Sequence, residues 1–477
     1  MSNLSELLPA GAGAKSADFV ASGTLGSGQT VTLRSDGKVE AVSETSQSNG
    51  TATAFETDQA SSLTSCYDTV NDKVIIAYRD EGNSSYGTSR VGTVSGTSIS
   101  FGTPVIFNSG TTTFCDSAYD VNSGKTVIVY RDVSNSSRGT AVVGTVSGTS
   151  ISFGSEYVFN TGITADPAIV YDSNAQKVLI AYMDFSNTYQ GTAVVGTVSG
   201  TTISFGSEYL FNPGGYDEDI ACVYDPVAQK NIILWRDANT NVGKAITATI
   251  SGTTVSYGTA VTVEAAPNMG DFNAATYDVQ AGKSVLIFKV GNTIAARTAE
   301  ISGTDITLGS KATSSFTGDY IRADYSVVSN SHIIAFANTS TAYGSTLPLS
   351  VSGSSLTFGT VNNFYTSAGV NATNATYDPD TEKTIILYGE GATPYAGYAF
   401  VYTAYSNNSA DFIGITDQAI ADTATGAVIV QGGVSDKVTG LTTGSDYYIQ
   451  TDGSLSTTVS SVPAGRALSS TSILLEG

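Results

Sequence analysis

Short apolar runs separated by polar turns form the basic pattern of the chain. Residues 125–131 (KTVIVYR) are almost entirely apolar between their charged ends, which predicts a strand covered on both faces. Residues 140–146 (TAVVGTV) and 151–159 (ISFGSEYVF) alternate more between apolar and polar positions, as strands nearer to solvent do. Together with residues 114–119, these segments predict four strands within about 50 residues and no helix between them.

This four-strand unit is repeated along the chain. A tyrosine followed by Asp, or once by Ser, ends the first predicted strand of each copy, and successive tyrosines are 52, 52, 53, 53, 48 and 52 residues apart. These tyrosines are Tyr67, Tyr119, Tyr171, Tyr224, Tyr277, Tyr325 and Tyr377. A Ser-Gly turn recurs at spacings of 52, 52, 52, 51 and 50 residues. Two markers with one period predict an all-β fold, a seven-bladed β-propeller.

The seventh copy is incomplete. Residues 372–402 supply three strands, and no fourth strand follows them. At the other end of the chain, residues 49–55 (NGTATAF) match the pattern of residues 101–107 (FGTPVIF), which precede another copy. We therefore expect residues 50–56 to form the outer strand of blade seven, so that an N-terminal strand closes the ring and removes an exposed edge.

Closure of the ring brings the two flanks of the propeller together. Residues 29–42 alternate around an Asp-Gly turn, and residues 446–455 do the same, so both flanks are expected to be β. The propeller is then inserted in a small β-module formed by both chain ends. The predicted parts are a docking peptide and first part of the anchor β-module at 1–47, the propeller at 48–404, and the rest of the module at 405–477.

Charge and composition exclude several functions. Lys and Arg total 21 against 42 Asp and Glu, a formal charge of -21, which disfavours nucleic acid and anionic membranes as partners. No apolar run approaches the ~18 residues of a membrane helix, and residues 1–15 lack the pattern of a secretory signal. His332 is the only histidine, so a Ser-His triad has no base to rely on, and we expect no enzyme. Carboxylate-based glycoside hydrolysis stays open as the alternative.

Acidic residues recur near the start of the innermost strands. In propeller geometry, connections such as residues 108–113 and 132–139 would be long loops on one face, which favours that face for function. The acidic set beside it is Asp116, Asp166, Asp219, Asp271 and Asp319. Converging carboxylates are suited to Ca²⁺; no other cofactor is expected. The alternative is that each carboxylate accepts backbone N–H bonds in its own loop.

Aromatic residues in the same loops are candidates for stacking on sugar rings. We select Tyr86, Tyr189 and Tyr216 because each is predicted to lie in a loop and not in a strand core. Tyrosine combines an apolar ring with a polar hydroxyl, which suits it to carbohydrate surfaces.

Both chain ends carry recognisable short motifs. They are residues 4–13 (LSELLPAGAG), the G-x-x-V-x-L-x-S-D-G pattern of residues 28–37, and residues 412–415, 447–453 and 464–468. With these motifs the chain ends resemble virion structural proteins of tailed bacteriophages, especially marine ones. The resemblance covers residues 1–47 and 405–477, and the blade pattern GTAVVGTVSGTSISFGS is similar to repeats in such proteins. It implies a fibre-like or decoration protein whose end module attaches a displayed domain to the particle.

The sequence thus predicts a non-enzymatic virion protein on the exterior of a tailed phage, assembled in the host cytoplasm. Its partners would be other capsid or tail proteins, copies of itself in a homo-oligomer, and a host-surface glycan or protein reached by the propeller, as in a tail-fibre adhesin. One alternative is a capsid decoration or head-fibre protein that merely displays the propeller. Another is a carbohydrate-active propeller enzyme, and a third is a bacterial surface adhesin unrelated to phage.

Overall fold

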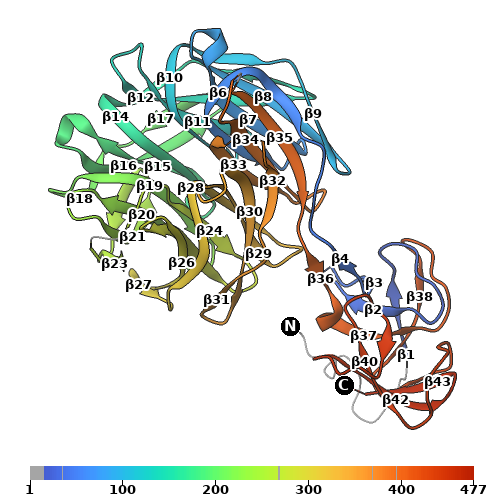
Figure 1. The fold of residues 1–477 in the computed structure, drawn as a ribbon. Helices are drawn as coiled ribbons and strands as arrows, with labels where there is room; N and C mark the ends of the chain where they lie inside the picture. Colours follow the sequence, from blue (N-terminus) through green and yellow to red (C-terminus); the bar gives the residue numbers. More distant parts are fainter. Residues whose placement is uncertain (1–15, 35, 267–268, 368, 394, 477) are drawn as a thin grey trace. The chain divides into compact units, whose positions relative to one another are not determined.

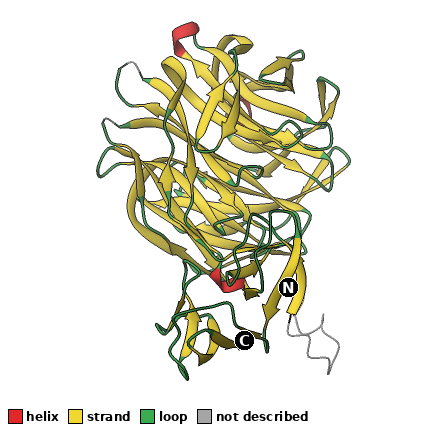
Figure 2. Cartoon of the chain, turned by 90° about the vertical axis from the view of Figure 1, so that its right-hand side faces the viewer, coloured by secondary structure: helices red, strands yellow, loops and turns green. Residues whose placement is uncertain are grey.

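The computed structural model describes residues 16–34, 36–266, 269–367, 369–393 and 395–476. Their secondary structure is β-strand and connecting turn (Figure 2), apart from short 3₁₀ turns at η2 (Glu81–Asn83), η3 (Phe185–Asn187) and η4 (Ser409–Asp411). No helix in this part of the chain has the length and apolar character needed to span a membrane. The expected docking peptide at residues 4–15 lies outside the described residues.

The chain divides into two compact units. The larger unit is Gln47–Ala404, and the smaller combines Met1–Ser46 with Tyr405–Gly477. Because strands from both ends of the sequence pair with each other in the smaller unit, it is not a contiguous segment.

The described strands of the larger unit fall into seven successive antiparallel groups, each led by an inner strand. The first three groups are β6 (Thr53–Asp68), β7 (Lys73–Asp80), β8 (Tyr86–Ser95) and β9 (Ser98–Phe101); β10 (Val105–Asp120), β11 (Lys125–Asp132), β12 (Arg138–Ser147) and β13 (Ser150–Phe153); and β14 (Tyr157–Asp172), β15 (Lys177–Asp184), β16 (Gln190–Ser199), β17 (Thr202–Phe205) and β18 (Tyr209–Asn212). The fourth and fifth are β19 (Asp217–Asp225), β20 (Lys230–Asp237), β21 (Val242–Ser251), β22 (Thr254–Tyr257) and β23 (Val261–Glu264); and β24 (Ala274–Asp278), β25 (Lys283–Val290), β26 (Thr293–Ser302) and β27 (Asp305–Leu308). The last two are β28 (Ala312–Ser326), β29 (Ser331–Asn338), β30 (Tyr343–Ser352), β31 (Ser355–Phe358) and β32 (Asn362–Tyr365); and β33 (Val370–Asp378), β34 (Lys383–Glu390), β35 (Ala396–Thr403) and β5 (Ser48–Asn49).

The repeated sequence pattern explains this local structure. The apolar second strand of each group is buried on both faces, as in β11, where residues 126–130 are all buried. The third and outer strands meet at a tight turn whose glycine has a positive φ, such as Gly148 at 61°. A side chain at that φ is strained, which is why glycine recurs there. The result is an all-β, propeller-like arrangement.

Two expectations about the outer strands were wrong. The predicted fourth strand at 151–159 is split into β13 and the start of β14, and both pair with β12. The predicted long loop at 108–113 is instead part of the continuous strand β10. The polar sequence of this segment favoured a loop in the prediction. In the structure, Asn108 hydrogen-bonds the Thr112 hydroxyl and the Gly110 backbone N–H, both at 2.8 Å, which satisfies polar groups within the strand. The strand therefore bulges without ending.

The last group pairs with the first strands of the same unit. In β35, Tyr402 is opposite Asn49 of β5, while Ala399 and Tyr398 are opposite Thr53 and Ala54 of β6. Figure 1 shows β6, in blue, beside β35, in orange. The strand β6 then continues as the inner strand of the first group.

The smaller unit contains two five-stranded sheets and a two-stranded one in the part of the chain that the structure describes. The first has the order β1-β38-β37-β2-β3, so two C-terminal strands lie between N-terminal ones. The second, β39-β43-β42-β40-β41, is C-terminal, and β4 pairs with β36. The bounds are β1 (Ser16–Val20), β2 (Thr30–Leu33), β3 (Val39–Ala41), β4 (Glu44–Thr45), β36 (Ser406–Asn407), β37 (Phe412–Thr416), β38 (Thr425–Val430), β39 (Val434–Ser435), β40 (Asp446–Ile449), β41 (Leu455–Ser456), β42 (Pro463–Ser469) and β43 (Ser472–Leu475).

Candidate functional site

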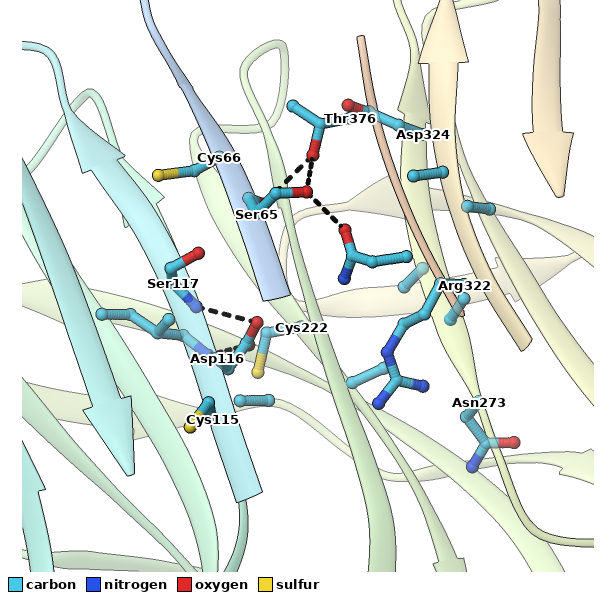
Figure 3. Close-up of a pocket in the computed structure, with 18 of the residues that line it drawn as sticks. Ser65, Cys66, Cys115, Asp116, Ser117, Cys222, Asn273, Arg322, Asp324 and Thr376 are labelled. Atoms are coloured by element: carbon cyan, nitrogen blue, oxygen red, sulfur yellow. Dashed lines mark hydrogen bonds between the residues drawn. The ribbon is translucent and has the colours of Figure 1, made fainter. Parts of the chain in front are cut away.

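A central cavity of about 490 Å³ lies among the inner strands of the larger unit. Residues from the inner strand region of all seven groups line it, and Figure 3 shows part of this lining. Its volume lies within the range of about 300–1,000 Å³ typical of small-ligand sites.

Three of the five predicted aspartates line this cavity: Asp116, Asp166 and Asp219. Each accepts a backbone N–H bond from the following group of strands. The donors to these carboxylates are, in order, Ile169 at 2.9 Å, Asp219 at 3.2 Å and Phe272 at 3.2 Å. Asp116 also accepts the backbone N–H of the adjacent Ser117 at 2.9 Å, so bonding within its own segment is present as well. The bonds to the next group connect neighbouring groups around the cavity.

A fourth carboxylate, Asp324, has the same role and was not among the candidates. It accepts the backbone N–H of Tyr377, from the next group, at 2.7 Å. Burial raises the pKa of Asp324 to about 6. Burial, together with the nearby Asp166, also raises the pKa of Asp219 to about 6. Desolvation disfavours the charged form of a carboxyl group, and this outweighs the stabilising hydrogen bonds in both cases.

The backbone is strained around the cavity. In six of the groups, one residue at the bulge of the inner strand, or just before that strand in the fifth group, has a left-handed conformation, with φ between 46° and 66°, although none of the six is glycine. These residues are Ser62, Phe114, Asp166, Asp219, Phe272 and Tyr320. Such a conformation costs on the order of 1–3 kcal/mol for a residue with a side chain, and strain of this kind clusters at functional sites.

Arg322 is the basic residue that lines the cavity, and the sequence analysis missed it. It is exposed although it lies in an inner strand, and Figure 3 shows its side chain extending into the cavity. Its Nη1 donates to the Ile321 carbonyl at 2.9 Å. Among the described residues, no carboxylate oxygen lies within ion-pair distance of it. The sequence did contain a signal for Arg322, because no other predicted first strand carries a basic residue.

Asn273 also lines the cavity and is 5% exposed. Its amide nitrogen donates to the Asp219 carbonyl at 2.8 Å. Its buried oxygen has no hydrogen-bond partner among the described residues. A buried acceptor left without a partner destabilises a protein by about 1–3 kcal/mol, so an external donor would be favoured there.

The other two predicted aspartates do not line the cavity. Asp271 forms an ion pair with Arg236 at 2.8 Å, and its side chain is 55% exposed. Arg236 also binds Asp219 at 3.1 Å and Glu218, so three carboxylates surround one guanidinium. Asp319 forms an ion pair with Lys289. In the described part of the chain, no group of three or more His, Cys, Asp or Glu side chains is arranged to hold a metal ion.

Two of the three predicted tyrosines come together on the surface. Tyr189 is 42% exposed, and its ring centroid lies 4.8 Å from that of Phe185 and 4.8 Å from that of Tyr216. We call these three residues the loop aromatic cluster. The backbone N–H of Ala238, two residues after Arg236, donates to the Tyr216 carbonyl at 2.7 Å, so the cluster lies beside the Arg236 ion network. Partial burial and the nearby Glu218 carboxylate raise the pKa of Tyr216. Tyr86, in contrast, is the first residue of β8 and is half-buried.

Comparison with known proteins adds information about the fold alone. No protein-family model matches the chain, and no curated protein matches it. The crystal structure of the BP39L lectin from Burkholderia pseudomallei is similar, with a TM-score of 0.55, 9% identity, and coverage of 74% of this chain and 99% of that chain. The Dos1 propeller has a TM-score of 0.45 and 9% identity over 74% of this chain and 95% of its own. At 9% identity, the likeness to the BP39L lectin structure indicates a shared fold.

Proposed function

We propose that the chain is a non-enzymatic attachment protein that binds a glycan on a cell surface through its larger unit. The observation that carries this proposal is the loop aromatic cluster beside the Arg236 ion network. Aromatic rings stack on the apolar faces of sugars, while guanidinium and carboxylate groups hydrogen-bond sugar hydroxyls. The likeness to a lectin structure is consistent with this proposal, although it extends to the fold only.

We further propose that the seven groups of strands are the blades of one closed propeller. The pairing of β35 with β5 and β6 supports closure, because it leaves the last group without a free edge there. The cavity lined from all seven groups supports a ring. In this proposal the smaller unit, with strands from both chain ends, is the anchor module.

The proposed setting is the exterior of a tailed-phage particle, with other virion proteins and further copies of the chain as partners. This part rests on the resemblance of the two chain ends to phage virion proteins. Electron microscopy of the particle with an antibody against the chain tests it, and absence of the chain from purified particles would refute it. Capsid decoration without adhesion is the runner-up, for which purified protein would not compete with particles for host cells.

Glycan binding is tested with the full-length protein on host polysaccharide. We expect Tyr189→Ala to weaken binding about tenfold, the effect of losing one good aromatic contact. Tyr405→Ala is the matched control, because Tyr405 is similarly exposed at 46% and belongs to the smaller unit. Equal binding by wild type and Tyr189→Ala would contradict the proposal. Shortened polysaccharide chains after incubation would instead support an enzyme.

A further inference from the structure

The central cavity has a donor side and an acceptor side. Arg322 supplies a guanidinium that only donates hydrogen bonds, and Asp116 and Asp166 supply carboxylates that only accept them. Figure 3 shows Arg322 and Asp116 on different sides of the cavity. Burial raises the pKa of both aspartates, and the positive charge of Arg322 acts on both in the opposite direction. The Arg322 guanidinium is therefore near enough to both carboxylates to act on them electrostatically. Among the described residues, no ion pair joins it to either carboxylate.

The cavity also has apolar surface, and two of the aromatic residues that form it have a strained backbone conformation. Phe114 and Phe272 line it, with φ of 54° and 66°. Bulky residues rarely adopt this conformation, and glycine would adopt it without strain. Phe114 is 38% exposed, and the guanidinium of Arg131 lies 4.5 Å from the centroid of its ring. The part of the ring that stays exposed offers apolar surface to a ligand in the cavity.

The charge pattern narrows the class of ligand. The carboxylates of Asp116, Asp166, Asp219 and Asp324 line the cavity and would repel an anion, while the guanidinium would repel a cation placed beside it. Hydroxyl groups both donate and accept, so they can bridge the two sides without introducing charge. A sugar ring adds C–H faces that pack on aromatic rings.

We propose that the central cavity binds one neutral, hydroxyl-rich molecule of monosaccharide size, held between Arg322 and the carboxylates of Asp116 and Asp166. Asn273 lines the same cavity, and its buried amide oxygen has no hydrogen-bond partner among the described residues. The cavity lining includes none of the residues of the loop aromatic cluster, although Asp219 of the Arg236 ion network also lines the cavity. The inference does not depend on the proposed glycan attachment.

The test uses the full-length protein and a panel of single sugars, followed by saturation-transfer NMR and calorimetric titration. Methyl mannoside, methyl galactoside and methyl fucoside are the neutral probes, and glucuronate and glucosamine are the charged ones. We expect at least one neutral probe to bind with a dissociation constant on the order of 1 mM. We expect both charged probes to bind at least about tenfold more weakly.

Two variants assign the binding to the cavity. Arg322→Met should weaken binding of the neutral probe about tenfold or more, with Arg466→Met, an exposed arginine in the smaller unit, as the matched control. Phe114→Gly relieves backbone strain, so the protein should fold even if Arg322→Met does not, and it should also lose binding. Tyr405→Ala, an exposed tyrosine of the smaller unit, should leave binding of the single sugar unchanged.

Three outcomes would overturn the inference. One is that no neutral probe binds at concentrations up to about 10 mM. Another is that the charged probes bind more tightly than the neutral ones. The third is that a neutral probe binds equally well to the wild type and to folded Phe114→Gly and Arg322→Met, which would place the sugar elsewhere on the protein.

Discussion

Phe55 offers a direct test of the pairing between the N-terminal strand and the last group of strands. It lies in the part of β6 that pairs with β35 and is 1% exposed. Its ring centroid lies 5.1 Å from that of Tyr78 and 6.1 Å from that of Phe101. A Cβ placed on Gly397 would lie 2.5 Å from the ring, so the ring packs directly on the backbone of β35. Phe55→Ala removes all of these contacts.

The expected loss follows from the burial. Replacing a fully buried phenylalanine by alanine lowers the free energy of unfolding by about 3–5 kcal/mol. A unit of about 360 residues has an unfolding entropy on the order of 0.75 kcal/mol per kelvin. A loss of about 4 kcal/mol therefore lowers the melting temperature by about 5 °C.

Phe159→Ala is the matched control. Phe159 is 6% exposed and packs on Gly139, with ring centroids 5.1 Å from Tyr182 and 5.9 Å from Phe205. These contacts repeat those of Phe55, but they lie between strands that are close in sequence. Differential scanning calorimetry of both variants should show similar shifts. A shift below about 1 °C for Phe55→Ala, with about 5 °C for Phe159→Ala, would refute the reasoning, because the N-terminal strand would then contribute little to the stability of the unit.

Three further predictions concern charged groups. Burial raises the pKa of Asp324 from 3.8 to about 6, so this carboxyl stabilises the fold at low pH, and that contribution, on the order of 3 kcal/mol, is lost as the pH rises from about 4 to 7. The free energy of unfolding of Asp324→Asn, measured with urea, should depend less on pH than that of the wild type over this interval. Equal pH dependence of the two proteins would contradict the role given to Asp324. Arg236→Met should destabilise the protein by about 2 kcal/mol by leaving carboxylates unpaired, and adding Glu218→Gln should restore part of that loss in thermal unfolding; a double variant no more stable than the single one would argue against this account. Addition of EDTA should leave the melting temperature unchanged, because Asp116 and Asp166 already accept backbone N–H bonds, and a fall would show that a cation is bound.

Local sequence patterns were sufficient to predict the presence of the strands and of most turns. The turn glycines have φ near 61–62° in successive copies, such as Gly96, Gly148 and Gly200, and this requirement is met within a few residues of each one. The division of the outer strand was not predictable in the same way. A Cβ on Gly154 would lie 2.1 Å from the carbonyl oxygen of Thr201, a residue of the next group, so the reason for that glycine lies about 50 residues away.

The candidate site depends even more on residues that are far apart in the sequence. Sequence position selected five aspartates for one region. Asp116, Asp166 and Asp219 line the cavity, whereas the side chains of Asp271 and Asp319 form ion pairs with neighbouring cations instead. Each of the three carboxylates that line the cavity accepts a hydrogen bond from a backbone N–H in the next group, 53 residues further along the chain. No local pattern encodes such a partner.

The sequence by itself determined the repeat, the strand order within each copy and the tight turns, because hydrogen bonding and steric limits act over a few residues. The tertiary structure decided which strands from the two chain ends pair, which carboxylates meet, and where Arg322 points. These properties depend on the arrangement of all seven groups around one cavity, where residues separated by up to about 300 positions become neighbours, such as Ser65 and Thr376 at 2.6 Å.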